Sequence, residues 1–409
     1  MSHAVSPLAR PLPELPAVPG IRLATTASGL RYRGRDDLLL VELAPGTSVA
    51  GVFTTNLVCG HPVTWCRRIL PRGRARALVV NAGNANVFRG AEGDRAVAIE
   101  ARAAAALFGC DPEEVYVAST GVIGQKLDAE AIAALLPGLH HRLDPNGLAA
   151  AARAIMTTDT FPKAAVATAD LDGVPVTLAG IAKGSGMIAP DMATMLAFVF
   201  TDAAVAPPVL QAFLRAAVGT SFNCLTVDSD MSTSDTLLVF ATGAAGNPPV
   251  ETTSSPAARA FATALEAVCR ELAILVARDG EGATKLVTVE VEGAVDDRSA
   301  RTIALAIANS PLVKTAIHGE DANWGRVAMA VGKAGEPVEL EALAIAFGGH
   351  AVARDGGAVP DLDEAPIAAH LAGNEVTIAV RVGRGPGRAT VWTCDLSHAY
   401  IDINGRYRS

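Results

Sequence analysis

The sequence predicts an α+β protein in which sheets and helices are layered on one another. Half of the 409 residues are apolar and only 19% are charged, which is enough apolar material for a large core. The expected strands and helices interleave along the chain, but without the regular short crossovers of a doubly wound sheet. Aromatic residues make up only 4% of the chain, so we expect the layers to pack closely through small side chains.

The first part of the chain alternates strands with helices. Apolar runs that end in turn residues predict strands at 37–43, 51–55, 77–81 and 115–118. Apolar residues at helical spacing predict helices at 94–108, 128–136 and 148–156. Asp94 is expected to cap the first of these helices.

A hairpin is expected next. Asp172 and Gly173, which accommodate positive φ angles, join apolar runs at 164–171 and 174–181. Pro175 cannot donate a backbone hydrogen bond, which indicates either that the second arm lies at a sheet edge or that its assigned range is slightly off. The same patterns later in the chain predict helices at 207–218, 256–278 and 299–308. They predict strands at 236–241, 285–291, 338–347, 375–382 and 390–395.

Composition argues against several classes of protein. The net charge is −8 and no basic stripe is present, unlike a nucleic-acid-binding protein. The six cysteines lack the short spacings of a zinc site, so no metal is expected. Charged residues and prolines interrupt the longest apolar stretch, 195–218, which therefore cannot span a membrane. Residues 1–19 lack the pattern of a signal peptide. We expect a cytoplasmic protein.

One glycine-rich stretch carries the most chemical information. It runs Lys-Gly-Ser-Gly-Met-Ile-Ala-Pro-Asp-Met-Ala-Thr-Met-Leu-Ala-Phe from Lys183 to Phe198. A Gly-Ser-Gly loop after a strand can cradle a phosphate, but the Walker and Gly-x-Gly-x-x-Gly spacings are absent, which favours an ordinary turn. Thr194 begins an apolar run expected to be a buried strand. Taken by itself, a threonine at that point is a structural residue.

The stretch closely resembles the ornithine acetyltransferase (glutamate N-acetyltransferase) family, as do segments along almost the whole chain. These include Thr-Thr-Asn at 54–56, Val-Asn-Ala-Gly-Asn-Ala-Asn at 80–86 and Ala-Ser-Thr-Gly-Val-Ile-Gly at 118–124. The others lie at 155–160, 221–228, 278–285, 310–316, 323–326 and 407–409. Agreement at so many separate motifs is not credible by chance.

The resemblance implies a self-cleaving enzyme of the N-terminal-nucleophile type, with the layered ornithine acetyltransferase or DmpA-like fold. The precursor is expected to cut itself between Ala193 and Thr194, giving an α chain (1–193) and a β chain (194–409). The Thr194 hydroxyl attacks the Ala193 carbonyl, and water hydrolyses the resulting ester. The new α-amino group, with a pKa of about 7.7–8.0, then serves Thr194 as a general base. No Ser-His-Asp triad is required.

The resemblance also implies which residues surround Thr194. Thr120 and Gly121 are expected to form the oxyanion hole, although Ser-Thr-Gly also makes an ordinary turn. Residues of the expected substrate site, beside Thr194 itself, are Thr157, Thr158, Lys183, Glu281, Asn404 and Ser409. Lys183 suits a carboxylate and Glu281 an ammonium. The alternatives are a solvated turn carboxylate for Glu281 and a frayed terminus for Ser409.

The implied reaction is a two-step acetyl transfer in arginine biosynthesis. Thr194 takes the acetyl group from N-acetyl-L-ornithine, and L-glutamate then takes it from the enzyme. Some members of the family also use acetyl-CoA as donor, and the sequence leaves this open. No cofactor is implied. The two fragments are expected to stay together as an αβ unit and to pair into α2β2.

Two other functions remain in view. An N-terminal-nucleophile aminopeptidase or amidase would share the self-cleavage but release its product to water. A non-catalytic amino-acid-binding protein would bind ornithine without forming an acetyl adduct. The chain departs from the usual family pattern at a few positions, which are Asp191, Met231, Ser234, His318, Ala322 and Ser409, the last standing where threonine is common. None of these is the nucleophile, an oxyanion residue, Lys183 or Glu281.

Overall fold

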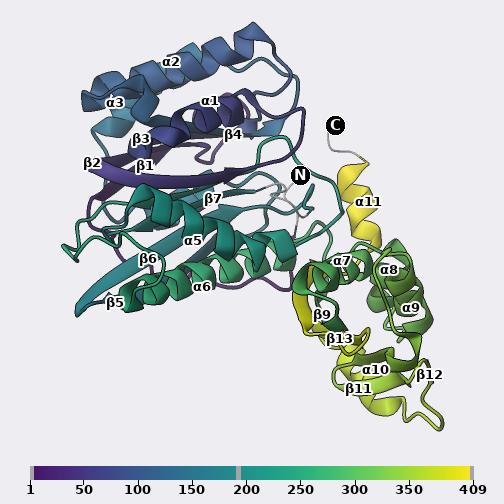
Figure 1. Cartoon of the computed structure of the whole chain (residues 1–409). Helices are drawn as coiled ribbons and strands as arrows, with labels where there is room; N and C mark the ends of the chain where they lie inside the picture. The colour runs from purple at the N-terminus through teal and green to yellow at the C-terminus, as the bar shows by residue number, and fades with distance from the viewer. Residues whose placement is uncertain (1–3, 190–194, 406–409) are drawn as a thin grey trace.

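The computed structural model describes residues 4–189 and 195–405, which form a larger and a smaller unit (Figure 1). Within these ranges the larger unit holds an eight-stranded sheet of order β4-β3-β2-β8-β7-β6-β5, with β1 paired to β2. Its strands are β1 (Ile21–Thr26), β2 (Leu38–Phe53), β3 (Arg74–Asn84), β4 (Val115–Val122), β5 (Lys163–Leu171), β6 (Val174–Lys183), β7 (Leu196–Thr201) and β8 (Thr236–Ala241).

The long strand β2 joins two halves of this sheet. Its first part pairs with β3 and its last part, from Ser48, pairs with β8, with a register shift between Glu42 and Thr47. The ring centroids of Tyr116 on β4 and Phe240 on β8 lie 6.0 Å apart. In a flat sheet these strands would be about 14 Å apart, three strand spacings. The sheet therefore folds over along β2 and encloses a core between its halves.

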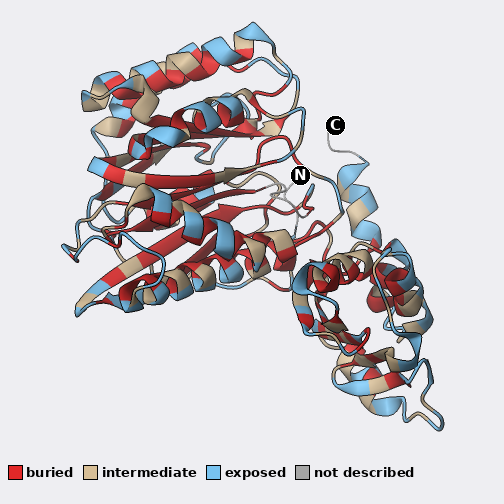
Figure 2. Cartoon of the chain, viewed as in Figure 1, coloured by how far each residue is buried: buried red, intermediate tan, exposed pale blue. Residues whose placement is uncertain are grey.

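Helices cover the two outer faces of the folded sheet. On one side α2 (Ala91–Phe108) and α3 (Ala129–His140) pack on β2, β3 and β4. On the other side α5 (Pro207–Gly219) packs on the later part of β2, and α6 (Pro256–Arg278) packs on β5 and β6. The result is a helix–sheet–sheet–helix stack with buried strands inside and exposed helix faces outside (Figures 1 and 2). Two shorter helices complete the unit, α1 (His61–Ile69) and α4 (Leu148–Ala154).

The buried face of α2 contains a carboxylate. Glu100 is fully buried, and neither carboxylate oxygen has a hydrogen-bond partner among the described residues. Burial raises the pKa of Glu100 from 4.5 to about 8. The folded protein thus holds this proton more tightly than the unfolded chain does. The stabilisation that this bound proton gives the folded state is complete below pH 4.5. It decreases as the pH rises above 4.5 and is lost once the pH passes about 8.

We therefore expect Glu100→Gln to stabilise the protein at high pH. Relative to wild type, the free energy of unfolding should rise by a value on the order of 4 kcal/mol at pH 9 and change little at pH 5. Denaturant titrations at the two pH values measure this difference. Glu130→Gln, at an exposed position of α3, is the control and should show no pH-dependent gain. An equal effect of both substitutions at both pH values would contradict the assignment.

The smaller unit is built on a six-stranded sheet of order β12-β11-β10-β13-β9-β14 within the described residues. Its strands are β9 (Leu286–Ala294), β10 (Ala344–Phe347), β11 (His350–Arg354), β12 (Gly357–Ala358), β13 (Glu375–Arg381) and β14 (Gly387–Cys394). Its helices are α7 (Asp297–Ala308), α8 (Pro311–His318), α9 (Trp324–Gly332) and α10 (Ala365–Leu371). The long helix α7 packs on β9 and β14.

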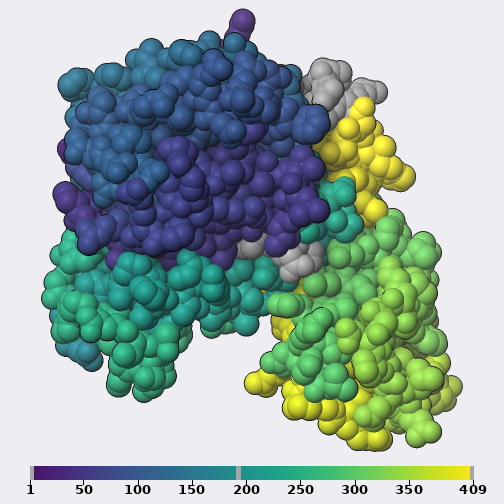
Figure 3. Space-filling view, turned by 45° about the horizontal axis from the view of Figure 1, so that its top comes forward, coloured from purple at the N-terminus to yellow at the C-terminus, as the bar shows by residue number. Residues whose placement is uncertain are grey.

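The last helix, α11 (His398–Asn404), leaves the smaller unit and returns to the larger one. Figure 3 shows this yellow segment against the blue and teal surface of the larger unit. Ala399, Asp402 and Ile403 of α11 line the same cavity as Gly121 of β4. None of the helices within the described residues combines the length and hydropathy needed to cross a membrane.

The α+β prediction is confirmed, and several elements match closely. The expected helix 256–278 and strand 236–241 are α6 and β8 as observed. The hairpin is also confirmed, because Asp172 and Gly173 have φ angles of 55° and 87°. Pro175 lies on an inner strand, but outside the part of β6 that pairs with β7. The arm is therefore not a sheet edge, since only its first residues lack a second neighbour, and its range was slightly off, since β6 continues to Lys183.

Other boundaries were wrong for identifiable reasons. The runs 37–43 and 51–55 are one strand, because β2 continues through its register shift. Helix α2 begins at Ala91 with Gly90 as its N-cap, and Asp94 instead contacts His61 at 2.7 Å. The strand predicted at 115–118 extends to Val122, because parallel pairing with β3 continues to Asn84. Only residues 344–347 of the predicted strand 338–347 are extended within the sheet.

Candidate active site

A cavity of about 860 Å³ lies where the larger unit meets α11. It is lined by Gly121 at the end of β4, by Thr157 and Thr158 after α4, and by Glu281 after α6. Residues far apart in the sequence therefore meet at one space. These four are all among the residues that the family resemblance assigns to the site.

Lys183 and Thr120 are buried and in contact. Lys183 is the last residue of β6, and its Nζ donates to Thr120 Oγ1 at 3.3 Å. Burial lowers the pKa of Lys183, while nearby carboxylates partly offset this effect. Because Thr120 accepts this hydrogen bond, its own hydroxyl proton is free to be donated elsewhere.

Gly121 occupies a position that only glycine can fill. Its φ is 133°, and a Cβ there would lie 2.2 Å from the carbonyl carbon of Gly83 on β3. Gly83 is its register partner and also has a positive φ, of 110°. The two glycines therefore bring the backbones of β3 and β4 into close contact beside the cavity. Thr120 and Gly121 lie within β4, so the ordinary-turn alternative is wrong.

Glu281 is held from two sides. Its Oε2 accepts a hydrogen bond of 2.7 Å from Asn404 Nδ2 on α11. On the other side, Gly186 allows close approach, since a Cβ there would lie 2.3 Å from the carboxyl carbon of Glu281. Burial raises the pKa of Glu281, opposed by hydrogen bonds from Asn404 and Thr158. Glu281 is buried, so it is not a solvated turn carboxylate.

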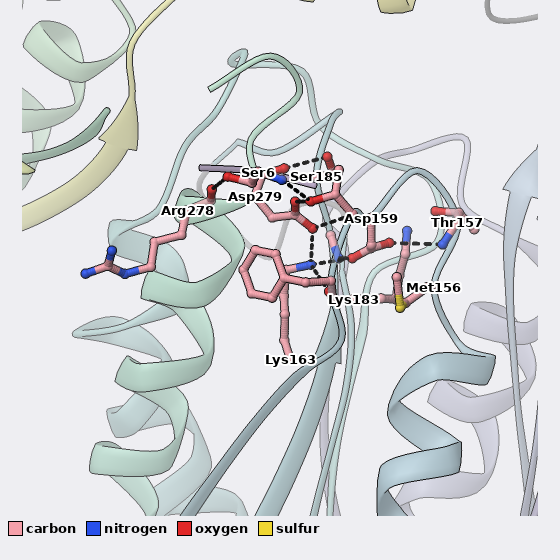
Figure 4. A network of polar contacts seen from close by, with 12 residues as sticks. Ser6, Met156, Thr157, Asp159, Lys163, Lys183, Ser185, Arg278 and Asp279 are labelled. Carbon is pink, nitrogen blue, oxygen red and sulfur yellow. Dashed lines mark hydrogen bonds and ion pairs between the residues drawn. The ribbon is translucent and has the colours of Figure 1, made fainter. Parts of the chain in front are cut away.

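A buried ion cluster formed by Asp159, Lys163 and Asp279 (Figure 4) lies at the wall of the cavity, which Asp279 helps to line. Lys163 Nζ lies 2.7 Å from Asp159 Oδ1 and 2.6 Å from Asp279 Oδ2, and all three side chains are fully shielded from solvent or nearly so. Burial alone would lower the pKa of Lys163, but the two carboxylates outweigh it and raise the pKa. Lys163 is therefore a charged, structural cation.

The ion cluster also fixes the walls of the cavity. Asp159 accepts hydrogen bonds from the backbone N–H of Gly184 at 2.6 Å and of Thr157 at 3.0 Å. The hydroxyl of Ser185 donates to the carbonyl of Asp279 at 2.6 Å. The Gly-Ser-Gly loop is thus occupied by contacts with the protein's own groups. These bonds set the positions of the segments that carry Thr158, Lys183 and Glu281.

The start of β7 lies beside Lys183. Leu196 is the register partner of Lys183, and the backbone N–H of Met195 donates to Asp235 Oδ1 at 2.7 Å. Asp235 is fully buried and close enough to Lys183 to favour its charged form. Thr194, which precedes Met195 in the sequence, lies outside the described residues, as do Ala193 and Ser409.

Sequence reasoning missed the ion cluster and Asp235. Asp159 and Asp279 stand inside motifs that carry the family resemblance, so their positions were visible but their partners were not. Lys163 stands at the start of a predicted strand, and no local signal indicates that its charge is buried. In the described part of the chain, no group of three or more His, Cys, Asp or Glu side chains is arranged to hold a metal ion.

Comparison with known proteins decides the family. A model described as the ArgJ family matches residues 22–409. The chain belongs to the ArgJ family. It is 58% identical over 405 residues to the arginine biosynthesis bifunctional protein ArgJ of Gluconobacter oxydans, covering 99% of this chain and 96% of that one. The identically named protein of Bradyrhizobium diazoefficiens is 55% identical over 413 residues, with 100% of both chains covered.

A solved ArgJ structure supports the fold. The crystal structure of arginine biosynthesis bifunctional protein ArgJ from Bacillus halodurans aligns with a TM-score of 0.50 and 42% sequence identity. The alignment covers 52% of this chain and 99% of that chain, so the crystal chain is about half as long as this one. The resemblance found in the motifs is confirmed, and with it the layered ArgJ fold.

Proposed function

We propose that this protein transfers an acetyl group from N-acetyl-L-ornithine to L-glutamate through an ester on Thr194, after a cut between Ala193 and Thr194. As a member of the ArgJ family, the chain is an acyltransferase of arginine biosynthesis. One observation carries the assignment of the site. Gly121 and Glu281 line one cavity, and Lys183 contacts Thr120, the neighbour of Gly121, and pairs with Leu196 on the strand that follows Thr194.

The first half-reaction makes the acetyl-enzyme. The Thr194 oxygen attacks the acetyl carbonyl of the donor, with the α-amino group of Thr194 taking the hydroxyl proton. Negative charge develops on the carbonyl oxygen, where the Thr120 hydroxyl and the Gly121 N–H stabilise it. The carbon–nitrogen bond then breaks, the leaving amine takes the proton, and ornithine departs.

The second half-reaction regenerates the free enzyme. The α-amine of glutamate attacks the acetyl ester, the bond to the Thr194 oxygen breaks, and that oxygen regains a proton. In this scheme Lys183 holds Thr120 in place and attracts a substrate carboxylate, and Glu281 attracts the donor ammonium. Thr157 or Thr158, Asn404 and Ser409 complete the substrate site.

The cut falls within the folded sheet. Residues 1–193 contribute β6 and residues 194–409 contribute β7, and these strands pair along Leu178–Lys183. Both proposed fragments also contribute to the cavity. Separation of the fragments would expose this buried pairing, so we infer that they stay associated as an αβ unit. That two such units form α2β2 is proposed from the family resemblance alone. The half-length ArgJ crystal chain agrees with a family of cut chains.

Intact mass spectrometry tests the proposal. N-acetyl-L-ornithine added to the purified protein should add the mass of one acetyl group to the fragment beginning at Thr194. Glutamate should then remove the adduct and yield N-acetyl-L-glutamate. Loss of the adduct at a rate independent of glutamate would indicate an amidase, and no adduct with any donor would indicate a binding protein. Acetyl-CoA in place of acetyl-ornithine shows whether the protein uses both donors.

Gly121→Ala should lower the rate of acetyl transfer by about 100-fold or more, the usual cost of one oxyanion donor. The added Cβ would lie 2.2 Å from backbone, so the strand must shift. Gly124→Ala is the matched control, because Gly124 also has a positive φ, of 82°, but a Cβ there has no atom within 4 Å. Steady-state kcat measures both. Similar kcat values for the two variants would argue against a role for the Gly121 amide.

A further inference from the structure

The two proposed substrates place opposite demands on one cavity. This inference rests on the proposed function, in which the donor side chain ends in an ammonium and the acceptor side chain in a carboxylate. In a two-step transfer the substrates occupy the same cavity in turn. Glu281 is a buried carboxylate that attracts the first and repels the second. Binding the acceptor side chain therefore requires a cation elsewhere in the cavity.

Arg31 lies where such a cation is required, at the wall of the cavity. It lines the same cavity as Gly121 and Glu281. Its stem rests on Gly83, because a Cβ on that glycine would lie 2.7 Å from Arg31 Cβ and 2.8 Å from Arg31 Cγ. Gly83 in turn contacts Gly121. Arg31 is thus separated from the proposed oxyanion site by a single glycine.

The guanidinium of Arg31 is available. The residue is exposed, and within residues 4–189 and 195–405 it makes no hydrogen bond or ion pair. The nearby Arg35 has a structural role. The guanidinium of Arg35 lies 3.7 Å from the Tyr32 ring centroid and donates a hydrogen bond to the carbonyl of Met156. The loop is therefore held by Arg35, which leaves Arg31 for a ligand.

Two other cations lie near the cavity, and each has another role. Lys163 is fixed between Asp159 and Asp279, and Lys183 contacts Thr120 and, in the proposed function, attracts the carboxylate that donor and acceptor share. Of the cavity-lining residues that the structure describes, Arg31 alone carries a positive charge. A guanidinium can bind a carboxylate with two parallel hydrogen bonds, a geometry that lysine cannot reproduce.

We propose that Arg31 binds the side-chain carboxylate of the acceptor amino acid, whereas Glu281 binds the side-chain ammonium of the donor. Arg31 is then a specificity residue of the second half-reaction only. The two half-reactions can be measured apart, because the acetyl-enzyme forms before the acceptor is added.

The test compares Arg31→Gln with Arg33→Gln. Arg33 lies in the same loop and is also exposed, but it does not line the cavity. Each variant is acetylated with N-acetyl-L-ornithine and then mixed with glutamate or with glutamine, the neutral isostere. In Arg31→Gln we expect unchanged acetylation and a rise of about 10- to 100-fold in the glutamate concentration needed for half-maximal discharge. The preference for glutamate over glutamine should collapse, and Arg31→Lys should restore part of it.

Arg33→Gln should behave as wild type in both steps. The proposal is overturned if Arg31→Gln discharges to glutamate as wild type does, or if it slows acetylation by the donor as much as discharge. The same experiment separates this failure from failure of the proposed function. If wild type forms no acetyl adduct, the proposed function fails; if it forms one that Arg31→Gln discharges normally, only the role of Arg31 fails.

Discussion

Thr194→Ala should yield a single uncut chain with acetyl-transfer activity reduced by at least about 10⁴-fold. The substitution removes the hydroxyl that attacks both the Ala193 carbonyl and the donor, and no other group can replace a missing nucleophile. Wild type should appear in intact mass spectra as two fragments, the second starting at Thr194. The variant should appear as one mass of full length.

Thr194→Ser is the matched control for this experiment. It keeps a hydroxyl at the same position, so it should still cut itself and retain measurable transfer. A single full-length mass for wild type would mean that the chain does not cut itself. Asp191, which departs from the family pattern close to the expected cut, would then be the first residue to test as the cause. An active, uncut Thr194→Ala protein would remove Thr194 from the mechanism altogether.

Lys163→Met should cost about 3–5 kcal/mol in the free energy of unfolding, the usual penalty for leaving buried charges unpaired. It removes the cation between Asp159 and Asp279, whose carboxylates would then face each other inside the protein. Asp159 also holds the backbone of Gly184 and Thr157. The variant should therefore show weaker substrate binding in addition to a lower denaturant midpoint.

Lys126→Met provides the comparison for Lys163→Met. Lys126 also pairs with a carboxylate, at 3.4 Å from Glu92, but its side chain is 69% exposed. An exposed pair of this kind contributes less than about 1 kcal/mol, so the denaturant midpoint should barely move. Equal shifts for the two lysine variants would show that the buried cluster contributes no more than a surface ion pair.

The sequence predicted the class of fold and most long elements because those depend on local patterns. Helix α6 has both a capping serine, Ser255, and an uninterrupted apolar face, and the hairpin turn has its own residue signature in Asp172 and Gly173. The fold-over of the sheet along β2 was not predictable in this way. It depends on which strands pair across some 200 residues of sequence, which no local periodicity encodes.

The candidate site was likewise predictable only in part. Thr120, Lys183 and Glu281 were predicted through family motifs; in the structure Glu281 lines the cavity, and Lys183 contacts Thr120 next to Gly121, which also lines it. Three features of the site follow only from the three-dimensional structure. They are the contact between Lys183 and Thr120, the burial of Lys163 and the position of Arg31 against Gly83. In each case the partner lies on a separate segment, so the residue type gives no indication of what it touches.

The cavity is closed by segments near both ends of the chain, since Ala4–Pro7 line it and Asn404 bonds to Glu281. Neither segment completes the wall of the cavity alone, so the body of the protein can fold while the site stays incomplete. A truncation that removes α11 should therefore yield a stable protein without a working site. For the same reason, an affinity tag is better inserted at the exposed turn around Gly356 than next to either segment.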